Sequence, residues 1–425
     1  MIRIAVLILV LALAGTARSE TLDEAWNAAL ASHQQLAAAQ ARRDAAGYDL
    51  DRAQSERLPQ LGVTSSFTQL DEAPAFDFGG GQTSQQLFAN DNFVTAGATV
   101  SLPLYSGGAI GAGIDAAEFA ATASEGQLAT VTKDIKLGTG EHYVQVLRAE
   151  SALLVADSNV ATLEALTADA KNRFDVGDVP KNDYLATSVS LANAVQRRLQ
   201  TRNALDYARA AYNRFLNRPL DAPVTLDPDL DIDDLVPADD LDSLILMASQ
   251  ERDELSSLSA QAQALRKRST VAKSGSRPQF ALTGGYMYLE NQFLTAEDFW
   301  VAGVSFQWSP FDGGRSRNRA AAFDSRANAV NHARNDLSTQ IALQVRRAWN
   351  DREEAESRTR VTESAVEQAI ENLRVVRDRY AAGASPNVDV LNAEALRQEA
   401  LSNYDNARYD LAIAKLRLAR AVGAL

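Results

Sequence analysis

The 425-residue chain has no cysteine, which excludes disulfides, thiolate metal sites and lipid attachment through an N-terminal cysteine. Its three histidines, His33, His142 and His332, are scattered among helical patterns and form no metal-binding motif. After residue 19, no apolar run approaches the roughly 18 residues typical of a membrane-spanning helix. Basic residues are too few for a nucleic-acid partner, because the net charge is -13 and phosphate binding needs a basic surface.

The N-terminus, by contrast, has the pattern of a secretory signal. Arg3 precedes an apolar run from Ile4 to Ala14, and Ala17-Arg18-Ser19 fits a small-x-small cleavage site. The run is shorter than the about 20 residues that a membrane-spanning helix needs. We therefore expect residues 1–19 to be removed and the mature protein to leave the cytoplasm.

The chain contains an internal duplication. Residues near 93–217 reappear near 299–423 at an offset of 206, so that Arg173, Phe174 and Gly177 return as Arg379, Tyr380 and Gly383. Earlier in each copy the offset is 219, which gives the first copy 13 extra residues between its two strand-like segments. A period this long is not that of a solenoid. It predicts two similar structural units in one chain.

The predicted domains follow from this duplication: a first repeat at 20–217, an acidic linker at 218–240 and a second repeat at 241–425. Each repeat reads as helix, strand, strand, long helix and return helix. One helix of about 36 residues is predicted from 21 to 57, since Pro59 forbids its continuation. Period-two alternation predicts four strands, at about 60–71, 93–105, 279–290 and 299–310.

Two very long helices are predicted after the strands. Each covers about 65 residues, nearly 100 Å at about 1.5 Å per residue, and is almost free of proline. Apolar residues spaced by seven, such as Val146, Leu153 and Val160, favour coiled-coil packing. Return helices of about 36 residues follow Pro180 and Pro386.

The acidic linker has aspartates at alternating positions, which invites comparison with a calcium loop. Starting at Asp229, an EF-hand needs glycine at position six and glutamate at position twelve, where this chain has Asp234 and Asp240. We therefore interpret the segment as a solvated linker and predict no metal site.

The four strands alternate apolar and polar residues, and aromatic residues lie near their ends. The aromatic residues expected in these bands are Tyr105, Tyr286, Tyr288, Trp300, Trp308 and Phe311, together with Phe93. The pattern fits an outer-membrane barrel with aromatic girdles, or a soluble sandwich packed against helices. The N-terminal signal and the polar opposite face favour the membrane.

Four strands cannot satisfy both edges of their own sheet, which lipid does not tolerate. Closure therefore requires several chains. Two chains would give eight strands, whose interior side chains fill, whereas three give twelve strands and leave a channel.

With these motifs the chain resembles the TolC family of outer-membrane export channels. The resemblance covers nearly the whole mature chain, and its motifs include Leu104-Tyr105-Ser106-Gly107-Gly108, Pro310-Phe311-Asp312-Gly313-Gly314 and both Arg-aromatic-x-x-Gly turns. It implies an α+β membrane protein, a homotrimer whose twelve-stranded outer-membrane barrel, with four strands per chain, continues into a long periplasmic α-helical coiled-coil barrel. The implied partners are a periplasmic adaptor (membrane fusion) protein, an inner-membrane pump or ABC transporter, and outer-membrane lipid.

The resemblance also implies roles for particular residues. The turns at Arg173, Phe174 and Gly177 and at Arg379, Tyr380 and Gly383 match the periplasmic tip, where an adaptor docks. Two pore-facing aspartates of the family correspond to Asp389 and Asn392, so one carboxylate is replaced here by an amide. Asp183 is the equivalent of Asp389 in the first copy and is expected to pair with a basic residue of a neighbouring hairpin. An arginine that helps to lock the closed state in the family is replaced by Ser385.

These expectations describe a passive exit duct of a tripartite efflux or type I secretion system, without a cofactor. The alternatives are helix capping and turn formation at the two tip turns, and for Asp389 the role of an N-terminal helix residue favoured by the helix dipole. For the whole protein, the alternatives are a non-transporting coiled-coil and barrel structural protein and a secreted adhesin. Arg315, Arg317 and Arg319 fit either anionic lipid headgroups at the barrel rim or a solvated helix face. No nucleotide-binding loop, Ser/His/Asp arrangement or carboxylate pair indicates an enzyme.

Overall fold

The computed structural model describes residues 19–72, 75–76, 85–86, 91–236, 240–291 and 295–425. Residues 1–18 of the predicted secretory signal lie outside this described part, as does most of the loop at 71–92 that contains the 13 extra residues. The chain divides into two compact units. The helical unit contains Met1–Ala39, Leu128–Asp253 and Ser338–Leu425, and the sheet unit contains Gln40–Gln127 and Glu254–Leu337.

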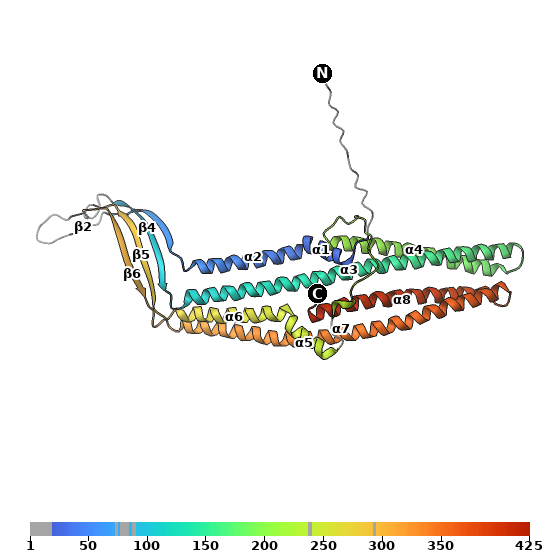
Figure 1. The fold of residues 1–425 in the computed structure, drawn as a ribbon. Helices are drawn as coiled ribbons and strands as arrows, with labels where there is room; N and C mark the ends of the chain where they lie inside the picture. The colour runs from blue at the N-terminus through green and yellow to red at the C-terminus, as the bar shows by residue number, and fades with distance from the viewer. Residues whose placement is uncertain (1–18, 73–74, 77–84, 87–90, 237–239, 292–294) are drawn as a thin grey trace, which may run out of the picture. The chain divides into compact units, whose positions relative to one another are not determined.

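The elements follow the predicted order in both copies (Figure 1). The first copy contains α1 (Leu22–Ser32), α2 (Gln34–Ser55), β1 (Gln60–Gln69), β4 (Asn92–Tyr105), α3 (Ala109–Asp175) and α4 (Lys181–Phe215), with a short pair β2 (Ala75–Phe76) and β3 (Gln85–Gln86) between β1 and β4. A short helix η1 (Asp233–Leu235) precedes the second copy, which contains α5 (Leu241–Glu251), α6 (Asp253–Ser274), β5 (Gln279–Leu289), β6 (Asp298–Gln307), α7 (Arg315–Ala381) and α8 (Asn387–Val422).

The prediction of one unbroken helix over 21–57 was wrong. The backbone becomes extended at His33 (φ -72°, ψ 123°), and the second copy breaks in the same way at Arg252 (φ -81°, ψ 109°). Tertiary contacts stabilise the first break: the Ser32 hydroxyl donates to the Leu216 carbonyl at 2.8 Å, and the His33 ring lies 4.8 Å from the Phe215 ring. Neither glycine nor proline marks these breaks, so the sequence pattern did not reveal them.

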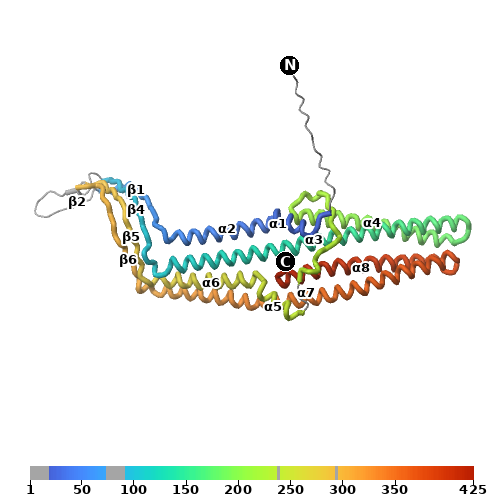
Figure 2. Tube along the Cα trace, in the orientation of Figure 1, coloured from blue at the N-terminus to red at the C-terminus, as the bar shows by residue number. Residues whose placement is uncertain are grey.

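The long helices predicted to follow each pair of strands, and the return helices predicted after them, are confirmed. Helices α3 and α7 each have 67 residues, and the return helices α4 and α8 have 35 and 36. Figure 2 follows the backbone of each long helix into its turn and back along its return helix. Among the described residues, no helix combines the length and apolar character required to cross a membrane.

The four long strands form one antiparallel sheet of order β1-β4-β5-β6. The register places apolar residues of neighbouring strands opposite one another: Val63 pairs with Ala98, Ala98 with Tyr286, and Tyr286 with Trp300. Because side chains alternate between faces, these residues share one face of the sheet. Threonine, serine, glycine and glutamine predominate on the other face, which also carries Met287 and Phe299.

A register shift between Pro103 and Tyr105 changes the face that the end of β4 presents. Tyr105 becomes the partner of Phe280, and the two rings lie 6.4 Å apart. Simple alternation from Val94 would have placed Tyr105 on the polar face, so the bulge brings it to the apolar face. Phe93 pairs with Thr68 and lies on the polar face, so its assignment to the aromatic bands was wrong.

The core of the helical unit lies where α1, α3, α4 and α8 meet the linker. Tyr143, Tyr212 and Leu416 are fully buried there. The linker contributes Val224, Leu226 and Ile232 to this core, and Leu226 forms a β-bridge with Glu20. The linker is therefore solvated on only one side, since its aspartates at 229, 231, 233 and 234 are exposed while these apolar residues are buried.

Candidate functional site

The two hairpin turns have nearly identical backbone geometry. Gly177 and Gly383 adopt φ values of 82° and 72°, a left-handed conformation that costs glycine little. In the first turn the Gly177 amide donates to Phe174 O at 2.9 Å, and the second turn repeats this bond from Gly383 to Tyr380 at 3.0 Å. The two copies inferred from the sequence thus have matching backbone hydrogen bonds and left-handed glycines in their turns.

A side chain of the first hairpin contacts the second. The Arg173 guanidinium lies 4.6 Å from the centre of the Tyr380 ring, and its Nε donates to the Asp178 carboxylate at 2.7 Å. Burial raises the pKa of the Tyr380 hydroxyl, although the nearby Arg173 charge opposes this. Arg379, the equivalent of Arg173 in the other copy, is exposed and has no ion pair or ring contact among the described residues.

A buried hydrogen-bond network also joins the hairpins. The Asn387 side chain, 2% exposed, donates to Thr187 Oγ1 at 2.9 Å and to the Asp183 carbonyl at 3.2 Å. Thr187 in turn donates to the same Asp183 carbonyl at 2.8 Å. Within this chain the Asp183 carboxylate accepts from its neighbour Asn182 at 3.1 Å.

Asp389 and Asn392 lie three residues apart in the first turns of α8, and both are exposed. Such spacing places both side chains on one face of a helix. The Ser385 hydroxyl donates to the Asp389 carboxylate at 2.7 Å, so an uncharged donor holds this carboxylate within the chain.

Glu394, which was not among the residues predicted from the sequence, is buried two positions beyond Asn392. It is 2% exposed, and Arg397 contacts both its oxygens, at 2.6 and 3.2 Å. Arg377 lies 3.6 Å away on α7. Glu394 also lines a polar groove of about 590 Å³ between α3, α4 and α8. A charged residue at helical spacing resembles a solvated face in the sequence, so only the tertiary structure identifies it.

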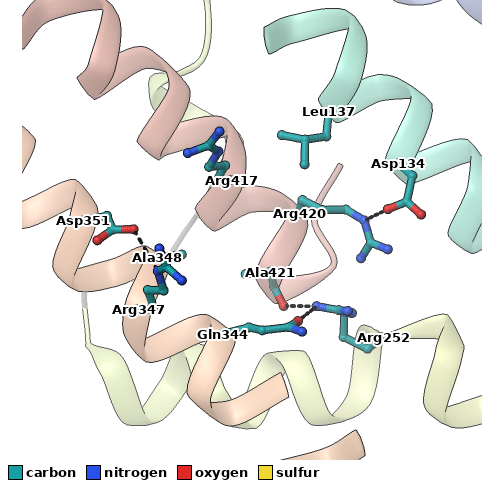
Figure 3. A pocket seen from close by; sticks show the side chains of 10 residues that line it. All are labelled: Asp134, Leu137, Arg252, Gln344, Arg347, Ala348, Asp351, Arg417, Arg420 and Ala421. Atoms are coloured by element: carbon teal, nitrogen blue, oxygen red, sulfur yellow. Dashed lines mark hydrogen bonds and ion pairs between the residues drawn. The ribbon is translucent and has the colours of Figure 1, made fainter. Parts of the chain in front are cut away.

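A second cavity, of about 500 Å³, lies near the end of α8 (Figure 3). Four arginines line it, and each has a partner within the helical unit. Arg252 donates to the Ala421 carbonyl at 3.0 Å, and Arg420 donates to Asp134 at 2.7 Å. Arg417 donates to Glu141 at 2.7 Å, and Arg347 lies 3.8 Å from Asp351. Arg252 also donates to the Gln344 side chain of α7 at 3.3 Å. These contacts connect the ends of α5 and α8 to α3 and α7, which is a structural role.

In the sheet unit, aromatic residues gather at two levels of the apolar face, and only some of them are the ones predicted from the sequence. Tyr286 contacts Trp300 at 5.3 Å near the loop end, with Tyr288 beside them. Phe280 and Phe306, which were not assigned to the bands from the sequence, contact each other at 5.0 Å near the helix end, where Tyr105 joins them.

The two bands are separated by aliphatic and small residues. Phe280 and Tyr286 are six positions apart, which is about 20 Å along a strand. Beyond the second band, Trp308 and Phe311 are 52% and 88% exposed. An apolar belt about 25 Å tall between aromatic bands is the pattern of a sheet that faces lipid.

A sheet with one apolar face, joined to long helical hairpins, is the architecture of outer-membrane channels of the TolC fold. The profile of the family described as "Outer membrane efflux protein" matches residues 25–218 and 244–424, and the chain belongs to this family. The resemblance to TolC drawn from the sequence is thereby confirmed, as is the location in the bacterial outer membrane with extension into the periplasm.

Individual relatives agree with this placement. Outer membrane protein TolC of Vibrio cholerae is 26% identical over 422 residues, covering 96% of this chain and 91% of that protein. The alkaline protease secretion protein AprF of Pseudomonas aeruginosa is 24% identical over 298 residues, covering 67% of this chain and 62% of that protein. The solved structure of CusC is similar in fold, with a TM-score of 0.80 and 15% identity over 95% of this chain and 92% of CusC.

Proposed function

We propose that three copies of the chain close into a twelve-stranded barrel in the outer membrane, continuous with a periplasmic barrel of helices. The observation that carries this proposal is the sheet itself: one face is apolar in register across all four strands, while β1 and β6 are left as edge strands. Open edges in lipid cost several kcal/mol for each unsatisfied backbone group, about the strength of a hydrogen bond in an apolar medium. Pairing of β1 with β6 of the next copy removes both edges.

The assembled channel is proposed to conduct substrate passively from the periplasmic side to the exterior. A periplasmic adaptor docks at the turns around Gly177 and Gly383, and an inner-membrane pump or ABC transporter supplies the energy. The name of AprF, a protease secretion protein, supports type I secretion as one system of this kind, beside tripartite efflux. Opening is a realignment of the two hairpins. These hairpins contact each other through Arg173 and Asn387.

The chain offers a clean test of assembly because it has no native cysteine. Cysteine pairs stepped along β1 and β6 are expected to cross-link neighbouring copies, with a ladder that ends at the trimer. Pairs on β1 and β5 are the matched control, because β4 and β6 flank β5 within one copy. Cross-linked dimers without trimers, or equal cross-linking of the control, contradict the barrel.

Conductance separates a duct from a non-transporting structural protein. In planar bilayers, variants with loosened hairpin contacts, such as Arg173→Gln, are expected to conduct. A lumen that stays sealed in every loosened variant, in a chain that still inserts and forms trimers, would favour the structural alternative.

A further inference from the structure

A third cavity, of about 560 Å³, lies in the sheet unit between the end of α6 and the start of α7. It is lined by three arginines, Arg268, Arg315 and Arg319, and by apolar side chains that include Val271 and Phe323. Among the described residues, none of the three guanidinium groups takes part in an ion pair. This cavity thus differs from the one near the end of α8, where each arginine has a partner.

The one carboxylate of the cavity is already engaged. Asp312 accepts from the backbone amides of Gly314 at 3.0 Å and Ser316 at 2.8 Å. Hydrogen bonding by the side chain and amide of Ser316 lowers the pKa of this carboxyl, and the Gly314 amide and the nearby Arg315 charge contribute in the same direction. Asp324 lies 3.4 Å from Lys273 rather than from the arginines. The cavity therefore concentrates positive charge in a chain whose net charge is -13.

The close approach of the two helices shapes the cavity. Gly275, which lines it, lies close to α7, because a Cβ atom there would be 2.8 Å from Ser316 Oγ and the Ser316 hydroxyl would have to move. Trp308 is fixed nearby by a bond from its indole nitrogen to the Ser276 carbonyl at 3.1 Å. The cavity thus follows directly after the aromatic band at the helix end of β5 and β6, at the level where lipid headgroups meet such bands.

We propose that this cavity binds the phosphate group of an anionic lipid headgroup. Free phosphate presents the same chemical group. Guanidinium groups bind phosphate oxygens through paired hydrogen bonds, and Val271 and Phe323 offer an apolar wall to the start of an acyl chain. The sequence had grouped Arg315, Arg317 and Arg319. The arginines that line the cavity include Arg315 and Arg319 but not Arg317. The third is Arg268, which lies 47 positions before Arg315 on another helix. The proposal rests on the membrane-facing role proposed above for the sheet.

The test uses the full chain in neutral detergent, titrated with dioleoylphosphatidylglycerol, with bound lipid counted by native mass spectrometry. One basic residue near an anionic headgroup is worth about 1 kcal/mol, or about fivefold in affinity. The Arg268→Gln/Arg319→Gln variant is therefore expected to bind about 25-fold more weakly. Arg317→Gln is the matched control, because Arg317 is exposed on the same helix but does not line the cavity.

Three results overturn the proposal: equal loss in the control, which means diffuse attraction; unchanged binding in the double variant; and equal binding of dioleoylphosphatidylcholine, which carries no net charge. Inorganic phosphate distinguishes the sources. If it occupies the same arginines at the same concentration as the lipid, the ligand is soluble phosphate and the lipid assignment fails. Bilayer conductance of the double variant is measured alongside: a conducting channel without the lipid effect refutes this inference and leaves the proposed function intact.

Discussion

The Arg173 guanidinium of the first hairpin lies 4.6 Å from the centre of the Tyr380 ring of the second, whereas the equivalent Arg379 has no such contact in the described part of the chain. The two copies therefore use the same arginine differently. One arginine joins the hairpins, and the other is exposed to solvent or to a partner.

Arg173→Gln is expected to ease separation of the hairpins. A cation–π contact at a partly exposed site is worth about 0.5–1 kcal/mol, so the open fraction in planar bilayers should rise about two- to fivefold. Arg379→Gln is the matched control and should leave the open fraction unchanged. Asp178→Asn removes the carboxylate partner of Arg173 but keeps the ring contact, so an equal effect in that variant would assign the stabilisation to the ion pair instead.

Loss of a bond in the network around Asn387 is expected to lower stability by more than loss of the Arg173 contact does. Thr187→Val leaves the buried Asn387 amide with one bond instead of two, at a cost of about 1–3 kcal/mol for a buried polar group without a partner. Proteolysis near the turns should accelerate accordingly. Thr201→Val is the control, because the Thr201 hydroxyl bonds only to Arg197 O of its own helix. Equal acceleration in both variants would mean that the loss is one of helix packing alone.

Much of this fold was predictable from local patterns. The strands begin at Gln60 and Gln279, close to the predicted starts at about 60 and 279, because period-two alternation begins directly after Pro59 and Pro278. The turns at Gly177 and Gly383 were equally visible, since a reversing helix pair needs a left-handed residue.

The features that escaped prediction depend on partners distant in sequence. The break at His33 is stabilised by Leu216 and Phe215, and Asn387 finds Thr187 across 200 positions. The face of Tyr105 depends on a bulge beside Pro103, whose effect on the pairing with β5 the alternation pattern alone did not reveal. Patterns along one chain do not encode such pairings, so these residues were found only in three dimensions.

Substitution of Glu394 tests how much a buried charge that the sequence pattern did not mark contributes to stability. Glu394→Gln removes a nearly fully buried carboxylate that both Arg397 and Arg377 face, and breaking a buried pair from one side costs about 3–5 kcal/mol. The thermal midpoint of the helical unit should fall. The Glu394→Leu/Arg397→Leu variant removes both charges of the closer pair and should recover most of the loss. If the double variant is no more stable than Glu394→Gln, packing rather than charge determines the effect.

Two histidines around Phe215 predict a pH dependence. The His33 and His142 rings each lie 4.8 Å from the Phe215 ring, and burial lowers the pKa of both. For His142, Glu141 opposes this shift and Arg214 adds to it, while Nδ1 of His33 accepts from the Gln35 amide at 3.2 Å and so favours the neutral ring.

The unfolded chain therefore takes up protons before the folded chain as the pH falls below the ordinary histidine pKa of about 6.5. Stability from these residues is fully present above that pH and is lost below it. Thermal unfolding between pH 7 and pH 5 should show a falling midpoint, and the slope should decrease in the His33→Gln/His142→Gln variant. The exposed His332→Gln is the control, and an undiminished slope in the double variant would exclude the pair as its source.

The Asp389 carboxylate is expected to increase the preference of the assembled channel for cations. In a trimer its exposed carboxylate forms a ring of three negative charges, which favours cations at a constriction. Asp389→Ala should lower the cation preference in planar bilayers by about fivefold, since one unit charge at 4 Å in water contributes about 1 kcal/mol, and should weaken block by divalent cations. Ser385→Ala keeps the charge while removing its 2.7 Å bond, so selectivity should persist. Glu367→Ala, an exposed carboxylate on α7, tests for a general charge effect. Unchanged selectivity in Asp389→Ala would assign this residue to the N-terminus of α8, where a carboxylate stabilises the helix dipole without facing the pore.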